Sequence, residues 1–143
     1  YYGCREYGDF YAKAMSVFGK KYLERWKPDL IVPVPLHPRK KRMRGFNQAA
    51  YLAERLSVLT GIPWNGHLVK KIRSTRSQKK LNAIQRRQNL KNAYQVTERI
   101  PGFSVLVVDD VYTTGSTADA MAMCLLEAGA EKVYFLTICA GRA

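Results

Sequence analysis

Residues 104–117, SVLVVDDVYTTGST, constrain the fold of this chain more than any other stretch. The apolar run 105–108 is short and continuous, which suits a strand buried on both faces of a parallel sheet. Two carboxylates, Asp109 and Asp110, end the predicted strand 104–109, and a small-residue turn then leads into a helical pattern. Amide groups at such a helix start favour an anion, most often phosphate. Carboxylate acceptors beside these amide donors predict a sugar-phosphate site.

Strand and helix patterns alternate along the rest of the chain. Apolar runs at 29–35 and 132–139 predict buried strands, whereas 46–59 and 117–128 carry apolar residues at helical spacing. This alternation predicts an α/β fold, a three-layer parallel sheet with helices on both faces. The 143 residues fit one domain, so we assign residues 1–143 to a single unit.

A helical segment is predicted within residues 1–27, before the first strand. Asp9 has the chemistry of an N-cap, and Lys27 followed by Pro28 would end the helix. The apolar residues expected to pack against the sheet are Phe10, Ala14, Val17, Phe18 and Tyr22.

The positive charge of the chain is clustered. The net charge is +13, from 24 Lys and Arg against 11 Asp and Glu. Five cations fall within 39–44, in a predicted loop 36–45 that directly follows the strand 29–35, and nine fall within 70–91. Cations at the carboxyl end of a strand predict a polyanionic partner, which can be a pyrophosphate, a nucleotide or a nucleic acid. A solvated, solubilising surface is the alternative.

Residues 72–92 follow a second predicted strand at 62–69 and contain few large apolar side chains. A loop of this length in a compact domain is either functional or disordered. We interpret it as a flexible basic lid that closes over an anionic substrate and excludes water. A disordered linker is the alternative.

Several other classes of protein are disfavoured. Three cysteines far apart predict neither a disulfide framework nor a zinc site, which favours a reducing, cytoplasmic setting. No apolar run is long enough for a membrane span, and no signal peptide is visible. The chain begins with Tyr1 rather than Met, so we expect a segment upstream. No GxGxxG follows a strand and no GK[ST] follows Gly115, which argues against Rossmann and Walker sites. His37, between two prolines, is interpreted as a turn residue.

Three segments together resemble a known family. VLVVDDVYTTGST resembles the 5-phosphoribosyl-1-pyrophosphate (PRPP) motif of type I phosphoribosyltransferases. IVPVPLHPRKKRMRGFNQA is similar to the strand, basic loop and helix start of the ComF/GntX competence-protein family. The spacing Thr75-x-x-Gln78-x-x-Leu81, followed by Arg86-x-x-Asn89, resembles the basic lid of that family. The resemblance covers roughly residues 28–140 and implies a type I phosphoribosyltransferase fold.

The resemblance also implies a role for each matching residue. Asp109 and Asp110 would bind the ribose hydroxyls and hold Mg²⁺, and Arg39 and Arg44 would face the pyrophosphate. The 5′-phosphate would lie on Thr113, Thr114, Gly115, Ser116 and Thr117. The lid would contribute Gln78, Arg86 and Asn89.

Two departures from the family pattern matter. Family members usually begin with a four-cysteine zinc module, which this chain lacks. Thr113 occupies the position where purine-salvage relatives place an aspartate that acts as general base. The resemblance therefore defines the phosphoribosyl donor and leaves the acceptor open.

The function implied is Mg²⁺-dependent binding of PRPP, followed by phosphoribosyl transfer to an unidentified acceptor in a role related to competence and DNA uptake. One alternative is a sensor that binds a phosphoribosyl compound or nucleotide without catalysis. Another is single-stranded DNA binding, in which Tyr94 and Tyr112 offer stacking surfaces. Proteins of the competence machinery would be partners in either case.

Overall fold

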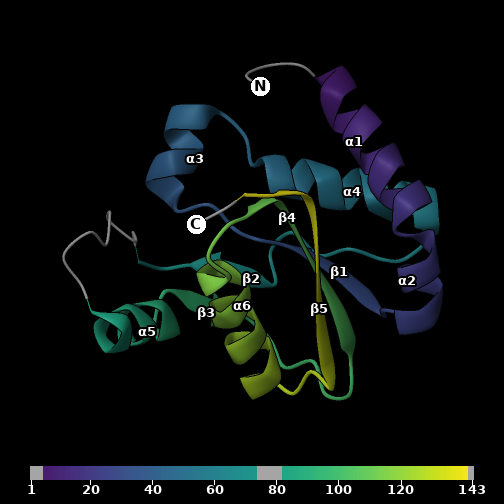
Figure 1. The fold of residues 1–143 in the computed structure, drawn as a ribbon. Helices are drawn as coiled ribbons and strands as arrows, with labels where there is room; N and C mark the ends of the chain where they lie inside the picture. Colours follow the sequence, from purple (N-terminus) through teal and green to yellow (C-terminus); the bar gives the residue numbers. More distant parts are fainter. Residues whose placement is uncertain (1–4, 74–81, 142–143) are drawn as a thin grey trace.

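The computed structural model describes residues 5–73 and 82–141 (Figure 1). Its central sheet has three strands, β1 (Leu30–Pro33), β4 (Ser104–Tyr112) and β5 (Lys132–Ala140), in the order β1-β4-β5. Both pairings are parallel, with β4 in the middle. The carboxyl ends of all three strands therefore lie at the same edge of the sheet, where open α/β sheets bind their ligands.

Helices cover both faces of this sheet (Figure 1). On one face α4 (Gln48–Thr60) packs on β1 and β4, and α1 (Arg5–Phe18) packs on α4 and β5. The short α2 (Lys20–Trp26) stacks the Trp26 ring on Tyr134 of β5, with ring centroids 4.6 Å apart. The opposite face is covered by α6 (Ser116–Glu127). The predicted three-layer α/β architecture is confirmed.

Successive side chains of β4 point to opposite faces of the sheet. Val105 and Val107 are buried in the core beneath α6, whereas Leu106 and Val108 are buried in the core beneath α1 and α4. The same alternation continues at the end of the strand. It directs Asp109 towards the α6 face and Asp110 towards the α1–α4 face.

A second, two-stranded sheet lies on the α6 side. It pairs β2 (Val69–Lys71) with β3 (Tyr94–Val96) in antiparallel register. The predicted strand at 62–69 is therefore wrong in extent, because only Trp64 bridges to β1 before β2 begins at Val69. The predicted lid is also not a plain loop, since it contains α5 (Ala83–Lys91), which a capping box at Asn82 starts.

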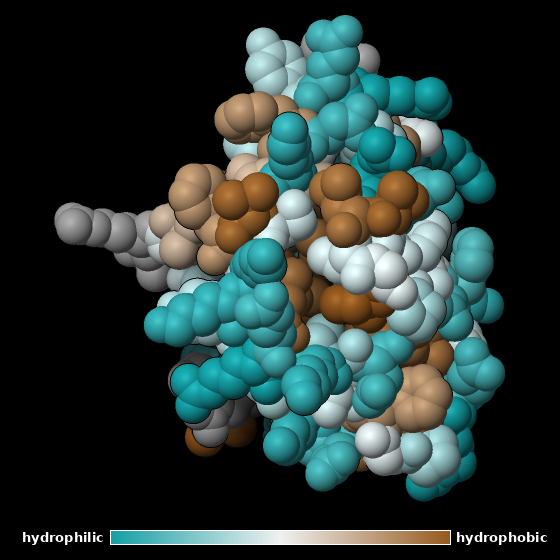
Figure 2. Space-filling view, turned by 90° about the vertical axis from the view of Figure 1, so that its right-hand side faces the viewer, coloured by the Kyte–Doolittle hydropathy of each residue, from teal (hydrophilic) through white to brown (hydrophobic). Residues whose placement is uncertain are grey.

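The N-terminal helix begins earlier than predicted and buries a different face. It starts at Arg5, so Asp9 lies inside the helix, and Lys27 closes the segment as predicted. Ala12 and Met15 face the core, and all of the predicted stripe except Ala14 is exposed, including 67% of Phe10 and 83% of Phe18. Figure 2 shows hydrophobic residues on this side of the molecule. Apolar residues occur on both faces of the helix, and the close approach of α1 to α4 favours the smaller Ala12.

The predicted basic loop 36–45 is mostly a helix, α3 (Pro38–Arg44). His37 is its N-cap, because the Nδ1 atom accepts a hydrogen bond from the Arg39 N–H at 3.3 Å, and Pro38 suits the first helical position. Gly45, at φ +82°, ends the helix. His37 was predicted as a turn residue, and in the structure it caps α3. Within the described part of the chain, no helix is long and apolar enough to cross a membrane.

Candidate functional site

The acidic pair lies within a strand rather than after it. β4 continues to Tyr112, because β5 pairs with it as far as the register Tyr112↔Ala140. The prediction that the strand ends at Asp109 is therefore wrong by three residues. Adjacent carboxylates on a strand start from opposite faces of the sheet. Here the Asp110 carboxyl still acts on Asp109 and raises its pKa, so the two groups are close enough to meet one ligand at the sheet edge.

Asp109 is half-buried on the α6 face. Its Oδ1 atom accepts a hydrogen bond from the Asp110 N–H at 2.9 Å. The pKa of Asp109 is raised to about 7, mainly by burial and also by the Asp110 carboxyl, while Lys71 opposes the shift. Without a nearby cation the ionised form of Asp109 is therefore unfavourable. The same carboxylate is a suitable ligand for a bound cation.

Lys71, at the end of β2, faces this carboxylate and was not singled out from the sequence. Its Nζ atom lies 5.5 Å from the ring centroid of Tyr94, its partner across the small sheet. Burial and then the charge of Lys40 lower the pKa of Lys71, while Asp109 opposes that change. In the sequence Lys71 is one of nine cations in 70–91, and only the β2–β3 pairing distinguishes it from its neighbours.

Tyr94 itself has a structural role. It is buried, and burial is the largest cause that raises its pKa to about 12, with a further contribution from Asp109. A ring in this position cannot stack on a nucleic-acid base. Tyr112 is 41% exposed and packs edge-on against Phe135.

The predicted loop 113–117, called the turn 113–117 below, connects β4 to α6, and its last two residues, Ser116 and Thr117, already belong to the first turn of α6. Gly115 is buried at φ +79°, and a Cβ there would lie 2.6 Å from the Tyr112 hydroxyl oxygen. The Thr114 hydroxyl donates a hydrogen bond to Ser116 Oγ at 2.9 Å. The predicted phosphate residues that line the hollow beside Asp109 are Thr113, Thr114, Gly115 and Thr117. This hollow measures about 20 Å³, room for about one water, so a phosphate would lie over its mouth rather than inside it.

A much larger cavity lies on the other face of β4. It measures about 900 Å³ and is bounded by α1, α4 and the ends of β4 and β5. Asp110 and Arg44 both line it, so the structure brings this predicted pair to one site. Arg39, in contrast, is exposed on α3 and lines neither the cavity nor the hollow.

The described geometry agrees with the comparisons with known proteins. The phosphoribosyl transferase domain family matches residues 5–143, nearly the whole chain. The chain belongs to the phosphoribosyltransferase family. Within it, the chain is of the ComF type, because it is 41% identical to the DNA utilization protein YhgH of Escherichia coli over 112 residues and 40% identical to competence protein F of Haemophilus influenzae over 109 residues.

These matches cover 78% and 74% of this chain but 49% and 48% of the relatives. The chain therefore spans about half the length of the relatives it matches. Competence protein ComFC of Bacillus subtilis is 34% identical over 114 residues, which is 80% of this chain and 44% of that protein.

Solved phosphoribosyltransferase structures share the fold. A purine phosphoribosyltransferase from Pyrococcus horikoshii superposes with a TM-score of 0.55 at 19% identity, over 90% of this chain and 72% of that one. A glutamine PRPP amidotransferase from Bacillus subtilis superposes with a TM-score of 0.57 at 20% identity, over 94% of this chain and 25% of that one. The type I phosphoribosyltransferase-like fold expected from the sequence is thus confirmed.

The lid residues are placed only in part. Gln78 lies outside the described residues. Arg86 and Asn89 belong to α5, where Asn89 is exposed. A contribution of this segment to the site stays a prediction.

The acidic pair fits Mg²⁺ by the chemistry of its donors. Within residues 5–73 and 82–141, no three or more His, Cys, Asp or Glu side chains gather to form a metal cage. Mg²⁺ is usually held by one or two carboxylates together with water and substrate phosphates. Asp109 and Asp110 supply the protein's part of such a set, and the remaining oxygens would come from the ligand.

Proposed function

We propose that this protein binds PRPP with Mg²⁺ at the carboxyl end of β4 and transfers the phosphoribosyl group to an acceptor. The observation that carries the proposal is the sequence of features along one strand and turn: two carboxylates, a buried glycine at positive φ, and the start of α6. We place the activity in the cytoplasm, in keeping with the free thiols of Cys124 and Cys139.

The donor would lie across the end of the strand. The amide groups that start α6, with the hydroxyls of Thr113, Thr114, Ser116 and Thr117, are suited to the 5′-phosphate. Asp109 and Asp110 are suited to the two ribose hydroxyls, since ionised carboxylates only accept hydrogen bonds. Binding the sugar through its 5′-phosphate and through its hydroxyls fixes the position of C1.

The reaction needs charge stabilisation more than a strong base. As the bond from C1 to pyrophosphate breaks, negative charge grows on the leaving group and positive charge grows on the sugar. Three cations would stabilise the leaving group: Arg44, which lines the same cavity as Asp110, Arg39 on α3, and Lys71, whose charge acts on Asp109. The acidic pair would stabilise the sugar cation. Bound Mg²⁺ would supply further charge neutralisation at the pyrophosphate oxygens.

Isothermal titration calorimetry tests the donor half of this proposal. We expect heat on addition of PRPP in the presence of Mg²⁺, loss of that heat with EDTA, and at least tenfold weaker binding by Asp110→Asn. Glu131→Gln is a matched control, because it removes one carboxylate charge from the exposed opposite edge of the sheet. No heat at millimolar PRPP with Mg²⁺ contradicts the proposal. Binding without pyrophosphate release against a panel of acceptors would instead favour a sensor.

The exposed cations of α3 favour a second candidate function, single-stranded DNA binding. Five of the seven residues of α3 are basic and exposed: Arg39, Lys40, Lys41, Arg42 and Arg44. A cationic helix of this kind suits a phosphate backbone. The expected signature is oligonucleotide binding that falls steeply with salt, survives Asp110→Asn and weakens in the double variant Lys40→Gln, Lys41→Gln. Partners in the competence machinery belong to the same proposal.

A further inference from the structure

The cavity of about 900 Å³ adjoins the proposed donor site and shares Asp110 and Arg44 with it, but it lies away from the turn that would hold the 5′-phosphate. Asp110 lines the cavity on the α1–α4 face, whereas the turn that would hold the 5′-phosphate lies beside Asp109 on the α6 face. Cavities that bind drug-sized ligands measure roughly 300–1,000 Å³. The volume of this cavity is at the upper end of that range, so it suits a molecule larger than a free nucleobase.

Aromatic side chains form much of the cavity wall. Tyr7 and Tyr11 come from α1, Phe46 precedes α4, and Tyr51 lies on α4. Aromatic faces stack on planar rings of any base, and each such contact is worth roughly 1–3 kcal/mol in nucleic-acid complexes. The wall therefore favours a ligand that carries a flat ring.

Polar groups in the same wall are left without partners. Among the described residues, Gln48 and Glu54 make no side-chain hydrogen bond or ion pair, and neither does Arg5. The Gln48 amide and the Glu54 carboxylate can form hydrogen bonds with the donors and acceptors on the edge of a ring. Arg5, together with the terminal nitrogens of Arg55, offers guanidinium groups that match a phosphate.

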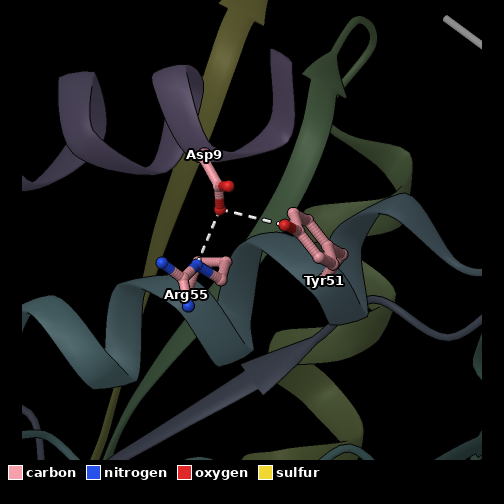
Figure 3. Close-up of polar contacts among 3 residues, drawn as sticks. All are labelled: Asp9, Tyr51 and Arg55. Atoms are coloured by element: carbon pink, nitrogen blue, oxygen red, sulfur yellow. Dashed lines mark hydrogen bonds and ion pairs between the residues drawn. The ribbon is translucent and has the colours of Figure 1, made fainter. Parts of the chain in front are cut away.

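The cavity wall is held in place by a cluster joining α1 to α4, shown in Figure 3. Asp9 Oδ1 accepts a hydrogen bond from the Tyr51 hydroxyl at 2.9 Å and lies 2.7 Å from Arg55 Nε, an ion pair without hydrogen-bond geometry. The Tyr51 ring packs on Gly8, where a Cβ would lie 2.5 Å from its Cε1 atom. A glycine inside a helix costs about 1 kcal/mol relative to alanine. Here it allows the ring to lie directly on α1.

We propose that this cavity binds a nucleotide-sized ring phosphate, that is, a heteroaromatic ring on a sugar that bears a phosphate. This inference rests on the proposed function, because it makes the cavity the acceptor side of a site whose donor side is the turn 113–117. The ring lies against Tyr51, its edge meets Gln48 and Glu54, and its phosphate meets Arg5 and Arg55. Asp9 is a positioning residue, since it holds Tyr51 and Arg55 without lining the cavity itself.

The test is a calorimetric titration with adenosine monophosphate (AMP) into protein saturated with ribose 5-phosphate. Ribose 5-phosphate fills the donor side and has no leaving group, so only the cavity remains for AMP. We expect AMP to bind at millimolar concentration and adenine to bind at least tenfold more weakly. Displacement of AMP by ribose 5-phosphate, or equal affinity for AMP and adenine, overturns the inference.

Three variants locate the binding. Tyr51→Ala should weaken AMP at least tenfold, and Asp9→Asn, which keeps the lining intact, about threefold. Phe18→Ala is the matched control, because it removes an exposed aromatic ring of α1 outside the cavity, and it should have no effect. Unchanged AMP affinity in a folded Tyr51→Ala or Asp9→Asn protein contradicts the inference.

Two further arms separate the remaining outcomes. If a short single-stranded oligonucleotide binds more tightly than AMP, and Tyr51→Ala weakens both, the ligand of the cavity is a nucleotide within a strand. If the oligonucleotide binds equally or more weakly, the ligand is a free nucleotide. PRPP binding distinguishes the two proposals. Loss of AMP binding with PRPP binding intact removes only the cavity assignment. AMP binding without PRPP binding keeps the cavity site and removes the donor function.

Discussion

The two faces of β4 at its carboxyl end are assembled in different ways. On the α6 face, Asp109 and the turn 113–117 lie within nine residues of one another in the chain. On the α1–α4 face, Asp110 shares a cavity with side chains that come from as far away as Arg5 and Cys139. The first face is a local motif, and the second is a product of tertiary packing.

This difference separates a general phosphate-binding motif from a cavity that is specific to this chain. A strand, a turn and a helix start can bind a phosphate in any protein that contains them, because backbone amides supply the donors. The cavity depends on how α1 meets α4, and hence on individual contacts such as Gly8 with Tyr51. We therefore expect the donor to be set by the turn and the acceptor by the cavity. The following substitutions act on one face at a time.

Asp109→Asn should have the largest effect on stability, with a size set by pH. Because the pKa of Asp109 rises from 3.8 to about 7 on folding, the folded state holds its proton more tightly, and stability falls as pH rises from about 4 to about 7. Asparagine mimics the protonated group. In metal-free buffer the variant should gain on the order of 3 kcal/mol of unfolding free energy at pH 8 and almost nothing at pH 4. Urea titrations at both pH values measure this, and an equal effect at both would contradict it.

Gly115→Ala should weaken PRPP binding at least tenfold, which is about 1.4 kcal/mol. Gly102→Ala is a matched control, because both glycines have φ near +75° to +80° but only a Cβ at Gly115 meets the Tyr112 hydroxyl. Both variants should lose about 1–2 kcal/mol of unfolding free energy from the left-handed backbone. Only Gly115→Ala should lose PRPP affinity in calorimetry. Equal PRPP affinities would argue against the turn as the phosphate site.

Lys71→Met should weaken PRPP binding about fivefold, roughly 1 kcal/mol, because it removes the charge that faces Asp109 and keeps the length of the side chain. Lys70→Met is the control, since its side chain alternates to the other face of β2 and is exposed. Calorimetry at two salt concentrations separates a local contact from a loss of general positive charge. Identical losses in both variants would assign the effect to net charge alone.

Gly8→Ala should have the smallest effect on stability, less than about 1 kcal/mol, because better helix propensity offsets the displacement of Tyr51. Its effect should be confined to the cavity face: AMP binding falls and PRPP binding is unchanged. Lys13→Ala, on an exposed position of the same helix, should change neither. A parallel loss of PRPP affinity in Gly8→Ala would mean that the two faces are not independent.

The same contrast explains which features the sequence could predict. β4, the turn and α6 follow from residues that are close in the chain, and the expected stripe of Met121, Cys124 and Leu125 does face the core. The core face of α1 could not be inferred, because apolar residues lie on both of its faces and only the approach of α4 selects Ala12. The roles of Lys71 and Tyr51 also could not be predicted from the sequence. Each depends on a partner from another element, Tyr94 across the small sheet in one case and Gly8 on α1 in the other.

A crystal structure of the protein with PRPP and Mg²⁺ tests the central claim most directly. We predict that the 5′-phosphate lies on the amides of 113–117 and that the acidic pair meets the ribose hydroxyls and the metal. C1 should then face the cavity lined by Tyr51. A 5′-phosphate bound inside the cavity, or on α3 away from the turn, would contradict the account.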